Sequence, residues 1–309
     1  MKQIILGTRG SQLALAQAEL AKQAVGRLPE RPEVITRIIA TTGDRRLDIS
    51  LNQSNPKIAK GLFTKELEEA LLTGEIDIAV HSLKDLPTEL PPDLELAATL
   101  PRHDPVDVLV SKSANSLREI PVSGMVATGS PRRARQIAVL RPDLHVTDIR
   151  GNVPTRIAKL LAEGSWNSLV LAKAGLERIG YSLTGSRMEF AGQGLLVSDL
   201  VEILPAAGQG AIGLEIRAND VGLKQMLTSV NHAPTWFCTG VEREFLRLLG
   251  GGCQLPLGVR TRIREGELHF EAIFFDECGK PRSGVVSGQY QTPWEAASAL
   301  LDKIYENAK

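Results

Sequence analysis

The chain has 309 residues, too many for one compact hydrophobic core, so we expect two or three domains. Lysine plus arginine equals aspartate plus glutamate at 36 each, and aromatic residues make up 4% of the chain, which argues against a nucleic-acid partner. No apolar stretch approaches the length of a signal peptide or a membrane span, and no large apolar stripe points to a partner chain, so we expect a cytoplasmic monomer without a membrane partner.

The N-terminal third of the chain alternates short apolar runs with amphipathic stretches. Strands are predicted at residues 4–6, 34–39, 76–80 and 94–100, and helices at residues 13–28 and 65–72. This alternation is typical of βαβ units, so it predicts a parallel sheet.

The same alternation restarts after the segment Pro101–Pro105. Strands are predicted at residues 106–110, 125–128, 145–149 and 168–172, and helices at residues 131–140 and 153–162. Residues 211–216 follow a stretch rich in glycine and alanine that suits a crossover. We expect this strand to return to the first sheet.

The pattern changes again near Thr235. A helix is predicted through Leu249, followed by strands at residues 257–263, 267–275 and 284–290 and a helix at residues 293–307, with a hairpin turn at Arg264–Gly266. We therefore predict two doubly wound α/β domains resembling type II periplasmic binding proteins and a small C-terminal α+β domain. Their predicted bounds are residues 1–101 with 210–230, residues 105–205, and residues 232–309.

Arginines follow several predicted strands where the next helix begins. They are Arg9, Arg132, Arg133, Arg150 and Arg156. Cations are unfavourable at the positive end of a helix dipole, whereas free backbone N–H groups and guanidinium groups together bind anions. Because ligands of open α/β sheets bind at the carboxyl ends of the strands, these arginines predict an anion-binding cleft.

One carboxylate is predicted among these cations. Residues 78–87 run from a buried strand into a loop, which places Lys84 and Asp85 at the same sheet edge. On a solvated loop this would be a weak ion pair. In a partly desolvated cleft the carboxylate can instead stabilise a developing cation by up to about 4 kcal/mol. The pattern indicates a polyanionic substrate whose reaction passes through a cation.

Cys253 lies in the most glycine-dense segment of the chain, Gly250–Gly258. The chain has three cysteines with no CxxC spacing and no cluster of histidines, so neither a disulfide framework nor a metal site is predicted. The segment is interpreted as an attachment or reaction point, with a buried cysteine in a tight loop as the alternative.

Seven short motifs follow one another along nearly the whole chain. They are RxSxLALAQ at residues 9–17, KGLFTKEL at 60–67, HSLKDLP at 81–87, SxRR at 130–133, RGN at 150–152, GQG at 208–210 and GCQxP at 252–256. Together they are similar to the porphobilinogen deaminase family, whose activity is also called hydroxymethylbilane synthase. A second GQG at residues 192–194 is set aside, because the family pattern continues after the one at residues 208–210.

The resemblance implies a reaction and its residues. A dipyrromethane cofactor would be held by a thioether to Cys253, and four porphobilinogen units would be deaminated and joined into hydroxymethylbilane for haem and tetrapyrrole biosynthesis. Asp85 is the implied catalytic residue, stabilising the azafulvenium cation formed as ammonia leaves. The implied cofactor-binding residues are Cys253, Lys84, Asp85, Thr128, Ser130, Arg132, Arg133, Arg150 and Gly151. The implied substrate-binding residues are Arg9, Ser11, Arg150, Arg156, Arg178 and Gln209.

One feature and three alternatives stay open at this point. Residues 44–60 are longer than the family pattern suggests, so lid roles for Lys57 and Lys60 are not assigned. A non-catalytic anion-binding module of the periplasmic-binding-protein type would share the two α/β domains but would need neither Asp85 nor Cys253. A cysteine hydrolase would need a base such as His269, and a nucleic-acid binder conflicts with the balanced charge.

Overall fold

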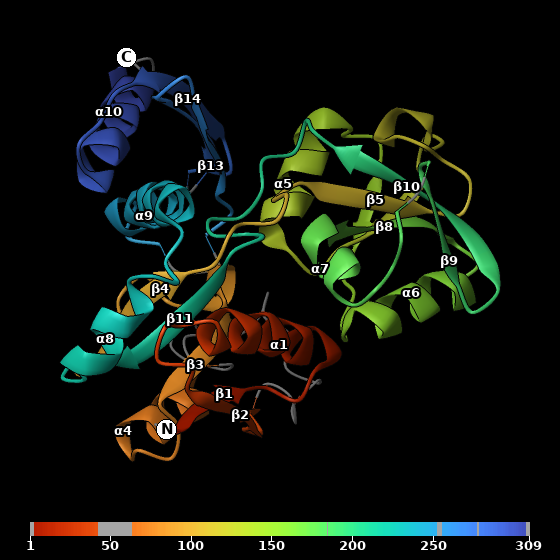
Figure 1. The fold of residues 1–309 in the computed structure, drawn as a ribbon. Helices are drawn as coiled ribbons and strands as arrows, with labels where there is room; N and C mark the ends of the chain where they lie inside the picture. The colour runs from red at the N-terminus through yellow and green to blue at the C-terminus, as the bar shows by residue number, and fades with distance from the viewer. Residues whose placement is uncertain (1–2, 43–63, 184, 252–254, 277, 307–309) are drawn as a thin grey trace.

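The computed structural model describes residues 3–42, 64–183, 185–251, 255–276 and 278–306. These residues form two α/β lobes and a smaller C-terminal α+β unit (Figure 1). Within the described ranges, no helix has the length and apolar character needed to cross a membrane.

The first lobe is built on a five-stranded sheet in the order β2-β1-β3-β11-β4. Its strands are β1 (Gln3–Thr8), β2 (Glu33–Ile38), β3 (Ile78–Ser82), β4 (Leu94–Thr99) and β11 (Ile212–Arg217), and its helices are α1 (Gln12–Gly26), α4 (Lys65–Leu72) and α8 (Val221–Leu227). β1 pairs in parallel with β2 and β3, as predicted, whereas β11 is antiparallel to both β3 and β4. The return strand therefore lies inside the first sheet.

Helix α1 packs closely on the sheet of the first lobe because its inner face carries small residues. Ser11 caps the helix by accepting a hydrogen bond from Ala14 N at 3.3 Å. Ala14, Ala18 and Ala21 are buried and recur at the spacing of one helix face. The first turn of α1 is thereby held at the carboxyl ends of β1 and β3.

The second lobe is built on a six-stranded sheet in the order β7-β6-β8-β5-β10-β9. Its strands are β5 (Asp107–Ser111), β6 (Met125–Ala127), β7 (His145–Thr147), β8 (Trp166–Ala172), β9 (Arg187–Phe190) and β10 (Gln193–Leu200), and its helices are α5 (Pro131–Leu140), α6 (Val153–Ala162) and α7 (Lys173–Arg178). β6, β7 and β8 run parallel, whereas β5 is antiparallel to β8 and β10.

The hairpin of β9 and β10 is not among the predicted strands. Its turn is made by Ala191 and Gly192, both at positive φ, and β10 buries Leu195 and Val197 on alternate positions. The glycines of residues 192–194 belong to this turn and the start of β10, so they form no part of the cleft.

The C-terminal unit packs α9 (Ala233–Leu248) and α10 (Pro293–Glu306) on the antiparallel sheet β12 (Gly258–Arg264), β13 (Glu267–Phe275) and β14 (Pro281–Gly288). The predicted hairpin between β12 and β13 is confirmed, with Glu265 and Gly266 at φ 52° and 81°, as a type I′ turn requires. Phe245 of α9 meets Phe270 of β13 edge to face, with ring centroids 5.3 Å apart.

Two segments connect the lobes and lie side by side: residues 100–106 lead out of the first lobe, and residues 201–211 return to it. His103 N donates to Gly210 O at 3.1 Å, so the outgoing and returning chains are hydrogen-bonded at their crossing. Gly210 has φ 83°, and a Cβ at this position would lie 2.5 Å from His103 O. Only glycine allows this close approach. Helix α9 contacts β4 and lies beside the crossing (Figure 1).

Candidate active site

A cavity of about 690 Å³ lies between the two lobes. Its walls come from the start of α1, the turn after β3, the start of α6, helix α7 and the returning segment near Gln209. These are the carboxyl ends of strands in both sheets, together with the crossing, as expected for a ligand site in open α/β sheets.

The first-lobe wall is positioned by the cap of α1. Arg9, Ser11 and Leu13 line the cavity, and Ser11 is held there by its capping bond. Gln17 lines the same wall and exchanges two hydrogen bonds with Ser82, at 2.8 Å and 3.0 Å. Gln17 is 3% exposed, so this pair fixes the end of β3 against α1.

Lys84 and Asp85 follow β3 in a single turn of 3-10 helix, Leu83–Asp85. Both line the cavity, with Asp85 exposed and Lys84 half-buried. Desolvation lowers the pKa of the Lys84 ammonium to about 8, Asp85 opposes this effect, and the positive charge of Arg133 adds to it. The predicted placement of this lysine–aspartate pair at the sheet edge is confirmed.

The second-lobe wall brings arginines together. Asn152 caps α6 by accepting from Thr155 N at 2.9 Å, and Arg150, Gly151 and Arg156 line the cavity around this helix start. Burial, together with the charges of Arg133 and Arg150, lowers the pKa of Arg156 to about 10. The guanidinium groups therefore remain charged at neutral pH but repel one another, which favours the binding of an anion.

Arg178 ends α7 on the same wall. Its Nη2 donates to Gly210 O at 2.6 Å, and burial lowers its pKa to about 10. This contact joins the second lobe to the crossing between the lobes.

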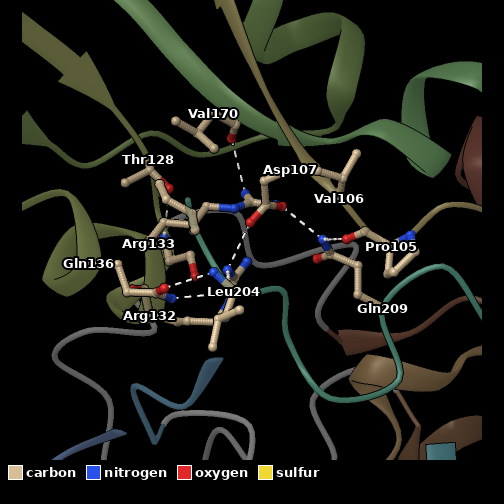
Figure 2. A network of polar contacts seen from close by, with 12 residues as sticks. Pro105, Val106, Asp107, Thr128, Arg132, Arg133, Gln136, Val170, Leu204 and Gln209 are labelled. Carbon is tan, nitrogen blue, oxygen red and sulfur yellow. Dashed lines mark hydrogen bonds and ion pairs between the residues drawn. The ribbon is translucent and has the colours of Figure 1, made fainter. Parts of the chain in front are cut away.

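The sequence predicted that both arginines at the start of α5 face an anion-binding cleft. The structure instead places them against a buried carboxylate. Both are 5% exposed, and both face the buried carboxylate of Asp107 (Figure 2). Arg132 Nη1 lies 2.7 Å from Asp107 Oδ2, and Arg133 Nη2 lies 2.6 Å from Oδ1. Arg133 reaches the cavity wall, whereas Arg132 does not. A protein carboxylate thus already shares these guanidinium groups.

Gln209 also meets this cluster. Its Nε2 donates to Asp107 Oδ1 at 2.8 Å and to Pro105 O at 2.6 Å (Figure 2). Its Oε1 lies 3.5 Å from Lys84 Nζ. The side chain is 1% exposed and fully engaged with protein groups. Gln209 therefore forms part of the wall and links both lobes.

Three of the arginines retain buried donors without a hydrogen-bond partner in the described part of the chain. They are the Nε groups of Arg132, Arg133 and Arg178. Buried donors are normally paired, and an unpaired one costs about 1–3 kcal/mol. Donors of this kind at and behind one cavity wall fit a ligand that carries carboxylates.

Some predicted site residues lie away from the cavity or outside the described ranges. Thr128 and Ser130 do not line it, although Ser130 N donates to Thr128 Oγ1 at 3.3 Å. Ser130 is the N-cap residue of α5, as predicted, but its side chain makes no capping hydrogen bond. Cys253 and the lid candidates Lys57 and Lys60 lie outside the described residues.

No histidine is among the described residues that line the cavity. His269 Nδ1 lies 2.8 Å from Ser287 Oγ on the exposed side of β13 and β14. Across the described ranges, no group of three histidine, cysteine, aspartate or glutamate side chains could hold a metal ion.

Asp107 and Gln17 were not identified from the sequence. Asp107 precedes three consecutive apolar residues of its strand, and a carboxylate at a buried position needs a cationic partner, so this was a usable signal. Gln17 interrupts the buried alanine face of α1, which is a weaker signal of the same kind.

Comparison with solved structures finds distant similarities. The methionine binding protein MetQ is 14% identical, with a TM-score of 0.42 over 74% of this chain and 89% of that chain. The periplasmic VFT2 domain of BvgS from Bordetella pertussis is 14% identical, with a TM-score of 0.41 over 74% of this chain and 86% of that chain.

The similarity to protein families and to curated proteins is far closer. The family model described as porphobilinogen deaminase, dipyromethane cofactor binding domain, matches residues 4–225, and the model described as porphobilinogen deaminase, C-terminal domain, matches residues 236–306. The porphobilinogen deaminase of Chloroherpeton thalassium is 45% identical over 279 residues, covering 90% of this chain and 85% of that protein. The porphobilinogen deaminase of Desulforudis audaxviator is 44% identical over 303 residues, covering 98% and 93%. The chain belongs to the porphobilinogen deaminase family.

Proposed function

We propose that this chain is a hydroxymethylbilane synthase, which deaminates four porphobilinogen molecules, joins them head to tail and releases hydroxymethylbilane. Membership of the family supports the reaction. One observation carries its assignment to this cavity: among the described lining residues, Asp85 is the one carboxylate, and it shares the cavity with Lys84 and five arginines. Such a site suits a polyanion that becomes cationic at one carbon.

The arginines are proposed to bind the acetate and propionate groups of porphobilinogen. Arg9 would act from the first lobe, and Arg150, Arg156 and Arg178 from the second. A guanidinium group pairs with a carboxylate through two parallel hydrogen bonds, so arginines on both walls fix the orientation as well as the charge of the ligand. Ser11, Gly151 and Gln209 complete the proposed binding walls.

The residues present fit a dipyrromethane cofactor. Its carboxylates would meet Arg133, whose buried Nε has no partner among the described residues, together with Lys84 and Arg150. Arg132, Thr128 and Ser130 would support this wall from behind. We propose that a thioether to Cys253 anchors it. When bound, the cofactor supplies the pyrrole to which the first porphobilinogen unit is joined.

Asp85 is proposed to be the catalytic residue. As ammonia leaves porphobilinogen, its methylene carbon becomes part of a cation delocalised over the pyrrole ring. A fixed carboxylate that accepts a hydrogen bond from the pyrrole N–H stabilises this cation where it forms. Asp85 interacts electrostatically with the adjacent Lys84 ammonium and with the Arg156 guanidinium, so the carboxylate lies between two cations of the cavity.

The mass of the intact denatured protein, measured together with turnover of porphobilinogen, tests this assignment. Wild type should carry an increment equal to two deaminated porphobilinogen units. Cys253→Ser should lack the increment, and Cys278→Ser, which alters an exposed thiol, should retain it. Asp85→Asn should turn over at least about 100-fold more slowly, the cost of losing one electrostatic stabiliser.

Two results would contradict the proposal. An unmodified wild-type mass that stays unchanged after addition of porphobilinogen would refute the cofactor and favour a binding module. Turnover of Asp85→Asn within a few-fold of wild type would remove Asp85 from the mechanism.

A further inference from the structure

Asp107 lies directly behind the cavity wall. It is the first residue of β5 and its side chain is completely buried. Its carboxylate meets Arg132, Arg133 and Gln209 at 2.7 Å, 2.6 Å and 2.8 Å (Figure 2). Among the described residues, Arg133 and Gln209 line the cavity but Asp107 does not. It therefore acts on the site only through other side chains.

Gln209 carries this contact across to the first lobe. Its Nε2 faces two acceptors, Asp107 Oδ1 and Pro105 O, so the amide can be oriented in only one way. That orientation places Oε1 toward Lys84 Nζ, 3.5 Å away. Asp107 of the second lobe is thereby connected through one amide to the lysine that adjoins Asp85.

The charge of Asp107 is permanent at physiological pH. Burial alone would raise the pKa of this carboxyl, but Arg132 and Arg133 outweigh burial and hold the pKa well below its usual range. The charged groups that act on Lys84 are Asp85 on its own turn, Arg132 and Arg133 on α5, and Asp107 on β5. Of these, the two carboxylates favour the protonated lysine and the two arginines oppose it.

We propose that Asp107 is a positioning residue for the reaction: it holds Arg133 at the wall, with Arg132 behind it, and through Gln209 it orients the Lys84 ammonium beside Asp85. This inference rests on the proposed function, because it assigns Lys84 and the arginines to the same site. Asp107 touches neither substrate nor cofactor in this arrangement, and its effect is exerted through the side chains that do.

The test is the pH dependence of kcat for the holoenzyme. Lys84 should give an alkaline limb near pH 8, and Lys84→Arg should remove this limb because a guanidinium stays charged. Asp107→Asn deletes a charge that raises the Lys84 pKa, so the limb should move to lower pH, by about half a unit or more. A limb that persisted in Lys84→Arg would belong to the aminomethyl group of the bound substrate and not to Lys84.

Two further variants separate positioning from folding. Asp77→Asn removes another ion-paired carboxylate, the partner of Arg217 in the first lobe, and should lower kcat at most uniformly without moving the limb. Gln209→Met leaves the pairs of Asp107 with both arginines but breaks the contact with Lys84, so it should also move the limb to lower pH. It decides the question if Asp107→Asn does not fold.

The inference is overturned if folded Asp107→Asn and Gln209→Met both superimpose on wild type in their pH profiles. Wild-type conversion of porphobilinogen is measured in the same series. Its absence would refute the proposed function, whereas an unmoved limb in an active enzyme refutes the role of Asp107 alone.

Discussion

Two buried ion-pair networks lie near the crossing of the lobes, and they differ in how completely they are satisfied. In the hinge network, Glu242 of α9 accepts hydrogen bonds from Arg102, Thr261 and Gly208 N, between 2.6 Å and 3.0 Å. In the arginine cluster, Asp107 meets Arg132 and Arg133, but both Nε groups lack partners in the described chain.

The difference separates a structural network from a ligand-binding one. Arg102 also donates its Nε to Gln209 O at 2.8 Å, so every nitrogen of this guanidinium hydrogen-bonds a protein group. In the arginine cluster, by contrast, the Nε groups of Arg132 and Arg133 have no hydrogen-bond partner among the described residues. Complete pairing stabilises one arrangement of the chain, whereas incomplete pairing raises the free energy of the empty site and is relieved by an anion.

Breaking the hinge network should have the largest effect. Glu242→Gln leaves the Arg102 guanidinium buried without a counter-charge, and we expect the free energy of unfolding to fall by about 3–5 kcal/mol. Urea unfolding followed by circular dichroism measures the loss. Glu244→Gln is the matched control on the same helix: its partner Arg247 is exposed, so the expected loss is about 1 kcal/mol or less. Equal midpoints for Glu242→Gln and wild type would show that the hinge network contributes nothing to stability.

Removing an arginine that has an unpaired donor should weaken substrate binding and leave the stability of the fold nearly unchanged. Arg178→Gln deletes a guanidinium whose Nε is unpaired, and we expect KM for porphobilinogen to rise about 10- to 100-fold, the value of a charged hydrogen bond. The melting temperature should change little, since among the described residues the side chain makes one hydrogen bond to the protein, to Gly210 O. Arg187→Gln, on the exposed edge strand β9, is the control. A lowered melting temperature with an unchanged KM would show that Arg178 stabilises the fold and does not bind the substrate.

Local signals allowed the sequence to predict some elements closely. Helices α5 and α6 have their predicted bounds, because a capping residue followed by proline marks each start. Strand β7 is shorter than predicted, ending at Thr147, since the chain turns away before Arg150. The cavity could be anticipated because strand ends in both lobes must meet at sheet edges.

Contacts between distant residues could not be predicted in the same way. Consecutive residues of a helix leave its axis about 100° apart, so the sequence alone could not show that Arg133 reaches the cavity while Arg132 turns inward. The partner of both, Asp107, is 25 residues or more away along the chain. Only packing of β5 against α5 brings them together.

The smallest effect is expected where α9 supports the turn that carries Asp85. Arg243, next to Glu242, donates to Leu86 O at 2.8 Å and to Pro87 O at 2.7 Å. Arg243→Gln should release this turn and lower kcat about tenfold, equivalent to about 1.4 kcal/mol, with KM nearly unchanged. Arg243→Lys should recover part of the loss, and Arg247→Gln, one turn further along the helix, should match wild type in steady-state kinetics. If Arg243→Gln raised KM and left kcat unchanged, the C-terminal unit would act on substrate binding rather than on the position of Asp85.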